Sequence, residues 1–208
     1  RMPCRDAAAS INWVATNEDL ARAVSVWEDE IGLDTEFIRT DTFYPVAGLY
    51  QIASGDSVYL LDPLAITDWS PFIEYLEDPQ RVKVMHACQE DIELLHHHIG
   101  ARPQSLFDTQ LANAYLSSDF SLSYARLVER LLGLDLGKHE TRSNWLKRPL
   151  TDQQLQYAIE DVIYLVPMYR VLRDGLAQRE REGWFAVDML ERATYADSSP
   201  HDYYRNVK

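Results

Sequence analysis

Two acidic residues, Asp34 and Glu36, lie two positions apart within an apolar segment that also contains Ile31, Leu33 and Phe37. Such a segment predicts a β-strand, and in a strand residues i and i+2 point to the same face of the sheet. Both carboxylates should therefore point in one direction. An isolated Asp-x-Glu pair is usually a solvated pair at the edge of a strand, so the pair alone does not predict a site.

Three further residues fit a shared site with this pair. Tyr157 and Asp161 are four positions apart in a helical pattern, which places both on one helix face. Asp91 follows the apolar segment 82–85 and lies near the start of the next expected helix. Taken singly, Tyr157 and Asp161 could be a packing residue and a surface acid, and Asp91 could stabilise a helix N-terminus. One site is indicated by the placement of all these residues, which lie in sequence on a strand, at the start of a helix and on a late helix.

Four carboxylates at these positions predict a two-metal nuclease site. Hydrolysis of a phosphodiester places negative charge on the oxygens around the phosphorus, and divalent cations on both sides relieve that charge. Mg²⁺ takes oxygen ligands, and two ions roughly 3.5 to 4 Å apart need several carboxylates to hold them. Without metal, the carboxylates would raise one another's pKa. We therefore expect two divalent ions, Mg²⁺ or Mn²⁺, bound by Asp34, Glu36, Asp91 and Asp161.

Length and composition predict one catalytic domain. The chain has 208 residues, of which 46% are hydrophobic and 25% charged, and this is enough for one substantial core. We assign residues 1–195 to this domain and residues 196–208, which contain Asp, Ser and Pro, to a linker. The chain has no run of 18 apolar residues and no apolar N-terminal signal, so we expect a cytoplasmic protein without a membrane segment. A disulfide between Cys4 and Cys88 is not expected.

The charge of the chain is strongly negative, with 20 basic and 33 acidic residues and a net charge of −13. This argues against a protein that coats polyanions, but a nuclease needs only local positive charge and its metal ions. One segment has such a local excess, with Lys138, Arg142, Lys147 and Arg148 against Glu140. We therefore expect substrate contacts in this segment, although a solvated loop is the simpler explanation. For Lys147 the two explanations are equally good.

The apolar patterns predict short strands among helices, followed by a helical half. A turn at residues 54–57 joins two strands into a hairpin, and the first strands form an antiparallel meander. Asn17 is a candidate N-cap of the first helix. Thr151 and Gln154 form a capping box at the start of the last long helix, and Pro167 should kink or interrupt that helix. The fold class is therefore α/β, a mixed sheet packed by helices with a helical C-terminal half. The expected strands are 12–15, 32–38, 49–53, 58–61, 82–87 and 105–107, and the expected helices are 17–30, one that contains 72–76, one that contains 91–95, 109–116, 122–132 and 151–176.

With these residues the chain resembles the DEDD superfamily of 3′-to-5′ exonucleases, in its tyrosine-bearing subgroup, and most closely the ribonuclease D family. The similarity runs from about residue 11 to about residue 184. The resemblance implies a ribonuclease H-like fold, in which parallel strands extend an antiparallel meander. Beyond the acids and the tyrosine, the similar segments are Tyr44-Pro45, Gly48-Leu49, Gln51-Ile52, Ile66-Thr67-Asp68-Trp69, His86-Ala87, Phe107-Asp108-Thr109-Gln110 and the stretch 138–150.

The resemblance also implies a role for each residue of the site. Asp34, Glu36 and Asp161 would hold the metal that activates the water, while Asp34 would also touch the second metal and Asp91 would reach it. Tyr157 would orient the attacking water, because a phenol with a pKa of about 10 is a poor base at neutral pH. A packed polar turn is at least as good an explanation for His86. The expected substrate contacts are His86, Lys138, Arg142, Trp145 and Arg148, with Trp145 stacking on the 3′ end or walling it.

The function that the resemblance implies is a metal-dependent 3′-to-5′ exoribonuclease that releases 5′-nucleoside monophosphates. We expect it to act as a monomer on RNA, trimming the 3′ ends of tRNA precursors and other structured RNA. Two alternatives stay open: a DNA 3′-to-5′ exonuclease of the Werner or proofreading type, and an inactive nucleic-acid-binding protein on the same fold. The catalytic motifs do not encode the recognition of the 2′-hydroxyl that separates RNA from DNA enzymes. Relatives often continue into helical nucleic-acid-binding modules, so the linker is expected to lead toward such a module.

Overall fold

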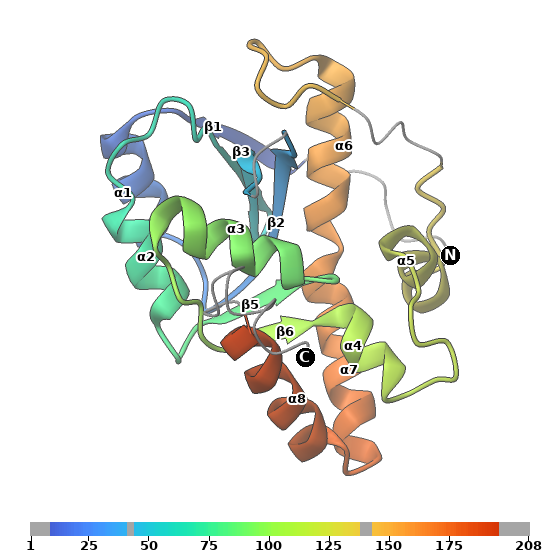
Figure 1. The fold of residues 1–208 in the computed structure, drawn as a ribbon. Coiled ribbons are helices and arrows are strands. Elements are labelled where there is room, and N and C mark those ends of the chain that lie inside the picture. Colours follow the sequence, from blue (N-terminus) through green and yellow to red (C-terminus); the bar gives the residue numbers. More distant parts are fainter. Residues whose placement is uncertain (1–8, 41–43, 138–142, 196–208) are drawn as a thin grey trace.

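A mixed sheet of six strands forms the centre of the molecule (Figure 1). The structure, a computed structural model, describes residues 9–40, 44–137 and 143–195. Within these residues the strand order is β1-β4-β3-β2-β5-β6. The strands are β1 (Ser10–Val14), β2 (Glu30–Ile38), β3 (Val46–Ser54), β4 (Ser57–Leu61), β5 (Val82–Met85) and β6 (Leu106–Asp108).

Strands β2, β3 and β4 form the antiparallel meander that the turn at residues 54–57 predicts. Strand β1 pairs with β4 in parallel, and β5 and β6 extend the other side of the sheet, also in parallel. Parallel neighbours need a crossover connection, and between β5 and β6 the helix α3 (Gln89–Ile99) supplies it. The predicted mixed sheet of a meander and parallel strands is confirmed.

Helices cover both faces of this sheet (Figure 1). They are α1 (Asn17–Ser25), α2 (Ser70–Glu77), α3, α4 (Thr109–Ala114), α5 (Tyr124–Leu132), α6 (Asp152–Ile163), α7 (Leu165–Gln178) and α8 (Glu182–Tyr195). In β3, the ring of Tyr50 contacts Phe72 of α2 and His98 of α3. The next residue, Gln51, points to the opposite face and reaches the carbonyl oxygen of Ala158 in α6. Helices α2 and α3 therefore pack on one face of the sheet, and α6 and α7 on the other.

Two glycines let other segments approach β2 and β3 closely. At Gly32 in β2, a Cβ atom would lie 2.7 Å from the carbonyl oxygen of Val162, near the end of α6. At Gly48 in β3, a Cβ atom would lie 2.5 Å from the Cβ atom of Trp145. Because real Cβ atoms do not approach so closely, a side chain at either glycine would push α6 or the segment of Trp145 away from the sheet.

The first helix differs from its predicted bounds. Its N-cap is Thr16, whose side chain accepts a hydrogen bond from the backbone N–H of Asp19 at 3.1 Å. The prediction that Asn17 caps this helix is therefore wrong by one residue. The helix ends at Ser25 and not at residue 30, because β2 already begins at Glu30.

The last long helix is interrupted, but earlier than Pro167 suggests. Thr151 and Gln154 form the predicted capping box at the start of α6. The break lies at Tyr164, between α6 and α7, and Pro167 lies in the first turn of α7. Proline is tolerated there because the first N–H groups of a helix have no partner within the helix.

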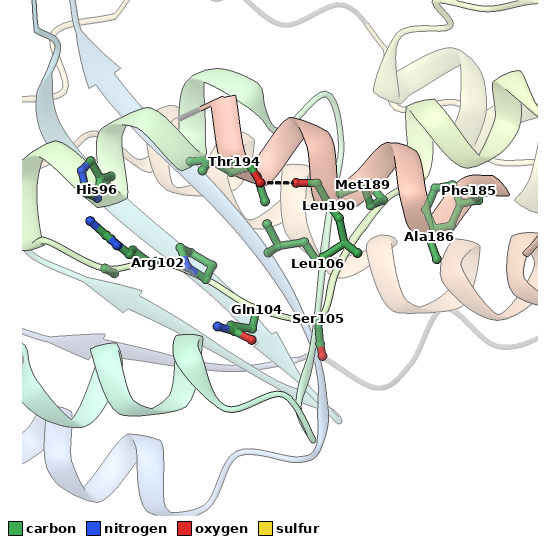
Figure 2. A pocket seen from close by; sticks show the side chains of 14 residues that line it. His96, Arg102, Gln104, Ser105, Leu106, Phe185, Ala186, Met189, Leu190 and Thr194 are labelled. Carbon is green, nitrogen blue, oxygen red and sulfur yellow. Dashed lines mark hydrogen bonds between the residues drawn. The ribbon is translucent and has the colours of Figure 1, made fainter. Parts of the chain in front are cut away.

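Helix α8 lies beyond residue 176, where the last helix expected from the sequence ends. Phe185 and Met189, four residues apart, are buried, whereas Trp184, Val187 and Leu190 are exposed. This mixture of buried and exposed apolar residues obscures the helical period in the sequence. Figure 2 shows α8 beside the segment 101–106, and a groove of about 600 Å³, which we name the α8 groove, lies between them.

Two predictions about the ends of the chain fall on residues outside the described ranges. These are the linker at residues 196–208 and the N-terminal residue Cys4. Cys88 is buried and its thiol is free. In the described part of the chain, no helix has the length and apolar character that a membrane crossing requires.

Candidate metal centre

Three carboxylates meet at the face of the sheet that α6 covers. One ligand atom from each of Asp34, Glu36 and Asp161 lies within 4.8 Å of the others. Asp34 and Glu36 point to the same face because they are alternate residues of β2, and Asp161 lies on α6, which packs on that face. All three side chains are half-buried, so ions can reach them from solvent. The strand and the helix therefore converge as the residue spacing predicts.

Asp91 lies beside this group and not within it. It is in the first turn of α3 and is only 7% exposed. The hydroxyl of Thr35, the β2 residue between Asp34 and Glu36, donates a hydrogen bond to Oδ1 of Asp91. The charge of Asp91 is close enough to raise the pKa of Asp34. Asp91 is thus within electrostatic reach of the other acids, but its oxygens are not among the atoms that could share one ion with all three.

Asp108 fixes the segment that leads into α3. Its buried carboxylate accepts hydrogen bonds from the backbone N–H groups of Ala87 at 2.9 Å and Cys88 at 3.1 Å. The same carboxylate caps α4 by accepting hydrogen bonds from the N–H groups of its first turn. Ala87 has a positive φ of 51°, which a non-glycine residue adopts only where its surroundings hold it there. One buried side chain therefore sets the start of the helix that carries Asp91.

The acidic residues raise one another's pKa. Burial raises the pKa of Asp34 well above its ordinary value, and the charges of the three other acids raise it further. Burial and the charge of Asp161 raise the pKa of Glu36 to about 8, although a hydrogen bond from Gln51 opposes this shift. Burial also raises the pKa of Asp91 to about 7, against a hydrogen bond from the threonine of β2. The folded protein therefore holds these groups in a state that favours protonation or a bound cation.

This set of donors fits a hard divalent cation. Carboxylate oxygens are the ligands that Mg²⁺ and Mn²⁺ prefer, and positive charge among them would relieve their mutual repulsion. A cavity of about 600 Å³, which we name the acidic cavity, opens in front of the group. No lysine or arginine among the described residues lines it. The acids that line it are Asp34, Glu36, Glu160 and Asp161.

Tyr157 lies on α6 one turn before Asp161 and lines the same cavity. Its ring lies against the ring of Trp145, with the centroids 6.1 Å apart and the planes at 37°. Burial, the charges of Asp161 and Glu36, and a hydrogen bond with Asp161 all raise the pKa of Tyr157. The phenol therefore stays protonated at neutral pH and can donate a hydrogen bond, but it cannot act as a base.

The predicted substrate contacts differ in whether the structure describes them and in how exposed they are. Lys138 and Arg142 are outside the described residues. Trp145 is 3% exposed and packs behind Tyr157, so its ring is not available as a stacking surface. This buried position follows from Gly48, which lets the tryptophan approach β3. The structure therefore makes Trp145 a support for Tyr157.

The guanidinium of Arg148 is engaged by hydrogen bonds within the protein. Its guanidinium donates hydrogen bonds to Oδ1 of Asp62 at 2.8 Å, to the carbonyl oxygen of Gly48 at 2.8 Å and to that of Trp145 at 2.7 Å. It also lies over the ring of Trp13, 5.7 Å from the centroid. Arg148 does not line the acidic cavity, and its donors join the segment around Trp145 to the sheet.

His86 lines the acidic cavity, but both nitrogens of its ring are engaged. Nδ1 pairs with the hydroxyl of Thr109 at 2.8 Å, and Nε2 donates to the carbonyl oxygen of Leu122 at 2.9 Å. Burial lowers the pKa of His86, which favours the neutral ring. A substrate can therefore meet the surface of this ring, whereas a new hydrogen bond to it would require one of these bonds to break.

Known proteins are similar in sequence to nearly the whole chain. A family model described as 3′-5′ exonuclease matches residues 11–177. Ribonuclease D of Pseudomonas paraeruginosa is 45% identical over 205 residues, which are 97% of this chain and 54% of that protein. The chain belongs to the ribonuclease D family. The family that the sequence analysis predicts is confirmed.

Solved structures agree with this membership of the ribonuclease D family. The crystal structure of Escherichia coli RNase D has a TM-score of 0.88 and 37% identity to this chain, covering 95% of it and 54% of that chain. By sequence, Escherichia coli ribonuclease D is 41% identical over 182 residues, which are 85% of this chain and 48% of that protein. The predicted ribonuclease H-like fold is confirmed. The chain spans about half the length of the curated ribonuclease D proteins that it matches.

Some contacts in this ribonuclease D site are absent from the sequence analysis. Nε2 of Gln51 lies 3.2 Å from Oε1 of Glu36 and 3.5 Å from Oδ2 of Asp34. Tyr124 lines the acidic cavity, and its hydroxyl donates to the carbonyl oxygen of Glu160 at 2.6 Å. A signal for Gln51 exists, because it is an amide in a largely apolar strand, but its position opposite Asp34 follows only from the register of β2 and β3.

Proposed function

We propose that this chain is the catalytic part of a metal-dependent 3′-to-5′ exoribonuclease that releases 5′-nucleoside monophosphates. The observation that carries the proposal is the meeting of Asp34, Glu36 and Asp161 within 4.8 Å, with Tyr157 bonded to Asp161 beside them. Membership of the ribonuclease D family and the match to 3′-5′ exonucleases support the polarity and the class of reaction.

Asp34, Glu36 and Asp161 would hold one divalent ion, and Asp34 and Asp91 would hold the second. Two bound ions of Mg²⁺ or Mn²⁺ supply positive charge to the phosphate oxygens and make a water molecule more acidic. The raised pKa values of Asp34, Glu36 and Asp91 support this assignment, since each group gains from a cation nearby. Asp108 contributes by holding the turn from which Asp91 extends.

Tyr157 would orient the attacking water through its hydroxyl. Its raised pKa keeps the phenol protonated, so it positions the water and takes no proton from it. Trp145 packs against the phenol ring and restricts its rotation. The remaining wall of the acidic cavity, from His86 and Tyr124, would lie against the 3′-terminal nucleotide.

The charge of the acidic cavity makes RNA binding depend on metal. Four acidic residues in the described part of the chain line the cavity, and they would repel a phosphate backbone that enters it without bound cations. The Escherichia coli relative is described as an exoribonuclease involved in structured RNA processing. We propose that the substrates here are likewise the 3′ ends of structured RNA, tRNA precursors above all.

A labelled substrate tests this function. A 3′-extended tRNA precursor carrying one label at its 3′-terminal nucleotide and another at its 5′ end is incubated with the protein and Mg²⁺. We expect labelled 5′-mononucleotide from the 3′ end at the earliest times, while the 5′ label stays on a long and slowly shortening RNA. Internal fragments at early times, or equal activity with the metal removed by a chelator, would contradict the proposal.

Matched strands of RNA and DNA separate the proposal from its nearest alternative. The 2′-hydroxyl is the group that lets a protein distinguish the two at one site. We expect faster release of mononucleotides from RNA than from a DNA strand of the same sequence. Faster release from DNA would favour a DNA exonuclease, and the absence of Mn²⁺ binding by calorimetry would favour an inactive nucleic-acid-binding protein.

A further inference from the structure

Gln51 is fully buried in the central strand β3, on the face that carries the acids. The antiparallel register places it opposite Asp34, so the two side chains extend from the sheet next to each other. Its neighbours Leu49, Ile52 and Ala53 in β3 are apolar. A polar side chain in such a strand needs hydrogen-bond partners, and the nature of those partners indicates what Gln51 does.

The amide nitrogen of Gln51 faces three acceptors. Nε2 lies 3.2 Å from Oε1 of Glu36, 3.5 Å from Oδ2 of Asp34 and 3.5 Å from the carbonyl oxygen of Ala158. Oε1 of Gln51 is buried and has no hydrogen-bond partner among the described residues. The reversed amide would set this oxygen against two carboxylates and a carbonyl group, so repulsion fixes the observed orientation.

These contacts join the two elements that carry the acids. Glu36 and Asp34 belong to β2, and Ala158 lies on α6 between Tyr157 and Asp161. A carboxylate that bonds Nε2 through one oxygen keeps the other oxygen for an ion. Without such a donor, the last side-chain torsion of Asp or Glu has a broad range, and the carboxylate can turn away from an ion.

We propose that Gln51 is a positioning residue for the metal-binding carboxylates. Its amide holds one oxygen of Glu36 and one of Asp34, so that the other oxygens face the acidic cavity, and it connects both residues to α6. This inference rests on the proposed function, because it concerns the same metal site. Residues that orient metal ligands in this way change metal affinity or activity by roughly 10-fold to 100-fold when they are replaced.

Gln51→Met tests this role directly. Methionine has a similar length and volume but no N–H donor, so the packing is kept and the bonds to the carboxylates are lost. We expect the affinity for Mn²⁺, measured by isothermal titration calorimetry, to fall by about tenfold. The exonuclease rate at limiting Mg²⁺ should fall as well and recover in part at saturating Mg²⁺, because the carboxylates themselves remain.

Asn113→Leu is the matched control. Asn113 is also a buried amide, but it lies in α4 and donates to the carbonyl oxygen of Asp119 at 3.1 Å. Replacing it removes a buried hydrogen bond without touching Gln51 or its acceptors. We expect the Mn²⁺ affinity of this variant to stay within about twofold of the unmodified protein, as for distant sites in general.

The outcomes separate this inference from the proposed function. A folded Gln51→Met variant with unchanged Mn²⁺ affinity would overturn the inference alone. If that variant does not fold, Gln51→Asn serves in its place, because it keeps the amide but withdraws it by one methylene from the carboxylates. Weaker Mn²⁺ binding by Gln51→Asn supports the role, and unchanged binding overturns it. An unmodified protein that binds no Mn²⁺ and degrades no RNA would overturn the proposed function together with this inference.

Discussion

The acidic cavity and the α8 groove have the same volume, about 600 Å³ each, but the residues that line them differ in charge. Among the residues that the structure describes, four acidic residues line the acidic cavity, whereas no Asp or Glu lines the α8 groove (Figure 2). The groove is walled largely by apolar side chains of α8 and of the segment 101–106, such as Leu106, Met189 and Leu190. Volume therefore does not distinguish a site from a surface depression in this protein.

The side chains of the two regions differ in whether they need a counter-charge. Burial of the apolar side chains beside the α8 groove stabilises the fold, and these side chains need no ligand. The carboxylates of the acidic cavity repel one another, and burial raises the pKa of Asp34, Glu36 and Asp91 above their ordinary values. Groups held in an unfavourable charge state within a cavity indicate a functional site with a missing counter-charge.

The largest effect should come from removing charge at the acidic cavity. In Asp34→Asn and Asp161→Asn, we expect the rate of mononucleotide release from a 3′-labelled RNA to fall by at least about 10³-fold, because each variant loses a metal ligand. The metal-free variants should unfold at the same temperature as the unmodified protein or higher, because repulsion is reduced. If both variants retain activity, the acidic cavity is no better supported as the catalytic site than the α8 groove.

Arg148→Met tests whether the cation that bonds Asp62 serves the substrate or the fold. The variant leaves Asp62, which is 6% exposed, without its partner at 2.8 Å. We expect the free energy of unfolding, measured with urea, to fall by about 3 kcal/mol, with the KM for RNA little changed. As a control, Arg170→Met removes an exposed cation 3.8 Å from Glu30 and should change stability by less than about 1 kcal/mol. A stable Arg148→Met variant with a greatly raised KM would show that this arginine binds RNA.

Tyr157→Phe removes one hydroxyl from the acidic cavity and keeps the ring that packs on Trp145. Because the hydroxyl orients the attacking water, we expect kcat to fall by roughly 10²-fold while KM stays nearly constant. Tyr124→Phe, which removes another hydroxyl of the same cavity, should have a much smaller effect on kcat, because that hydroxyl bonds a backbone carbonyl. Equal losses in the two variants would argue against a specific role for Tyr157.

The pH dependence of stability should reveal the acidic cluster without any substrate. The folded protein binds more protons than the unfolded chain between the ordinary pKa of Asp and Glu and the raised values, about 7 for Asp91 and about 8 for Glu36. The free energy of unfolding of the metal-free protein should therefore fall as pH rises through this range, by roughly 4 kcal/mol between pH 6 and pH 8.5. Saturating Mg²⁺ should remove most of this decline, since cations favour the charged form. Thermal unfolding curves that do not depend on pH would contradict the raised pKa values.

The smallest effect should come from the α8 groove. Leu190 lines it and is 70% exposed, so Leu190→Ser removes little buried apolar surface. We expect the free energy of unfolding to change by no more than about 0.5 kcal/mol and the rate of RNA degradation to stay the same. A loss of activity comparable to that of Asp34→Asn would place an essential contact in the groove.

Local patterns in the sequence predict the parts of the site that depend on one element each. The spacing of Asp34 and Glu36 needs only a strand, and that of Tyr157 and Asp161 needs only a helix. The capping box at Thr151 is likewise local, and it fixes the direction in which α6 starts. For this reason the mixed sheet and the faces of β2 and α6 are predictable from residue order.

The contacts that depend on distant segments are not predictable in this way. A basic residue has the same sequence pattern whether it faces RNA, solvent or a distant carboxylate. Arg148 bonds the carboxylate of Asp62, which lies 86 positions away in the sequence. The bond from Gln51 to the carbonyl oxygen of Ala158 spans 107 positions and requires the register of β3 and the packing of α6 together. These residues obtain their roles from tertiary packing, which a single sequence does not display.

The most direct test of the account is to locate the bound ions. Crystals of the protein grown with Mn²⁺ and a 5′-nucleoside monophosphate would give an anomalous difference map of the metal positions. We expect one peak enclosed by the carboxylates of Asp34, Glu36 and Asp161, and a second peak on the side of Asp91. A map with strong Mn²⁺ peaks elsewhere and none at these three carboxylates would show that the acidic cavity is not a metal site.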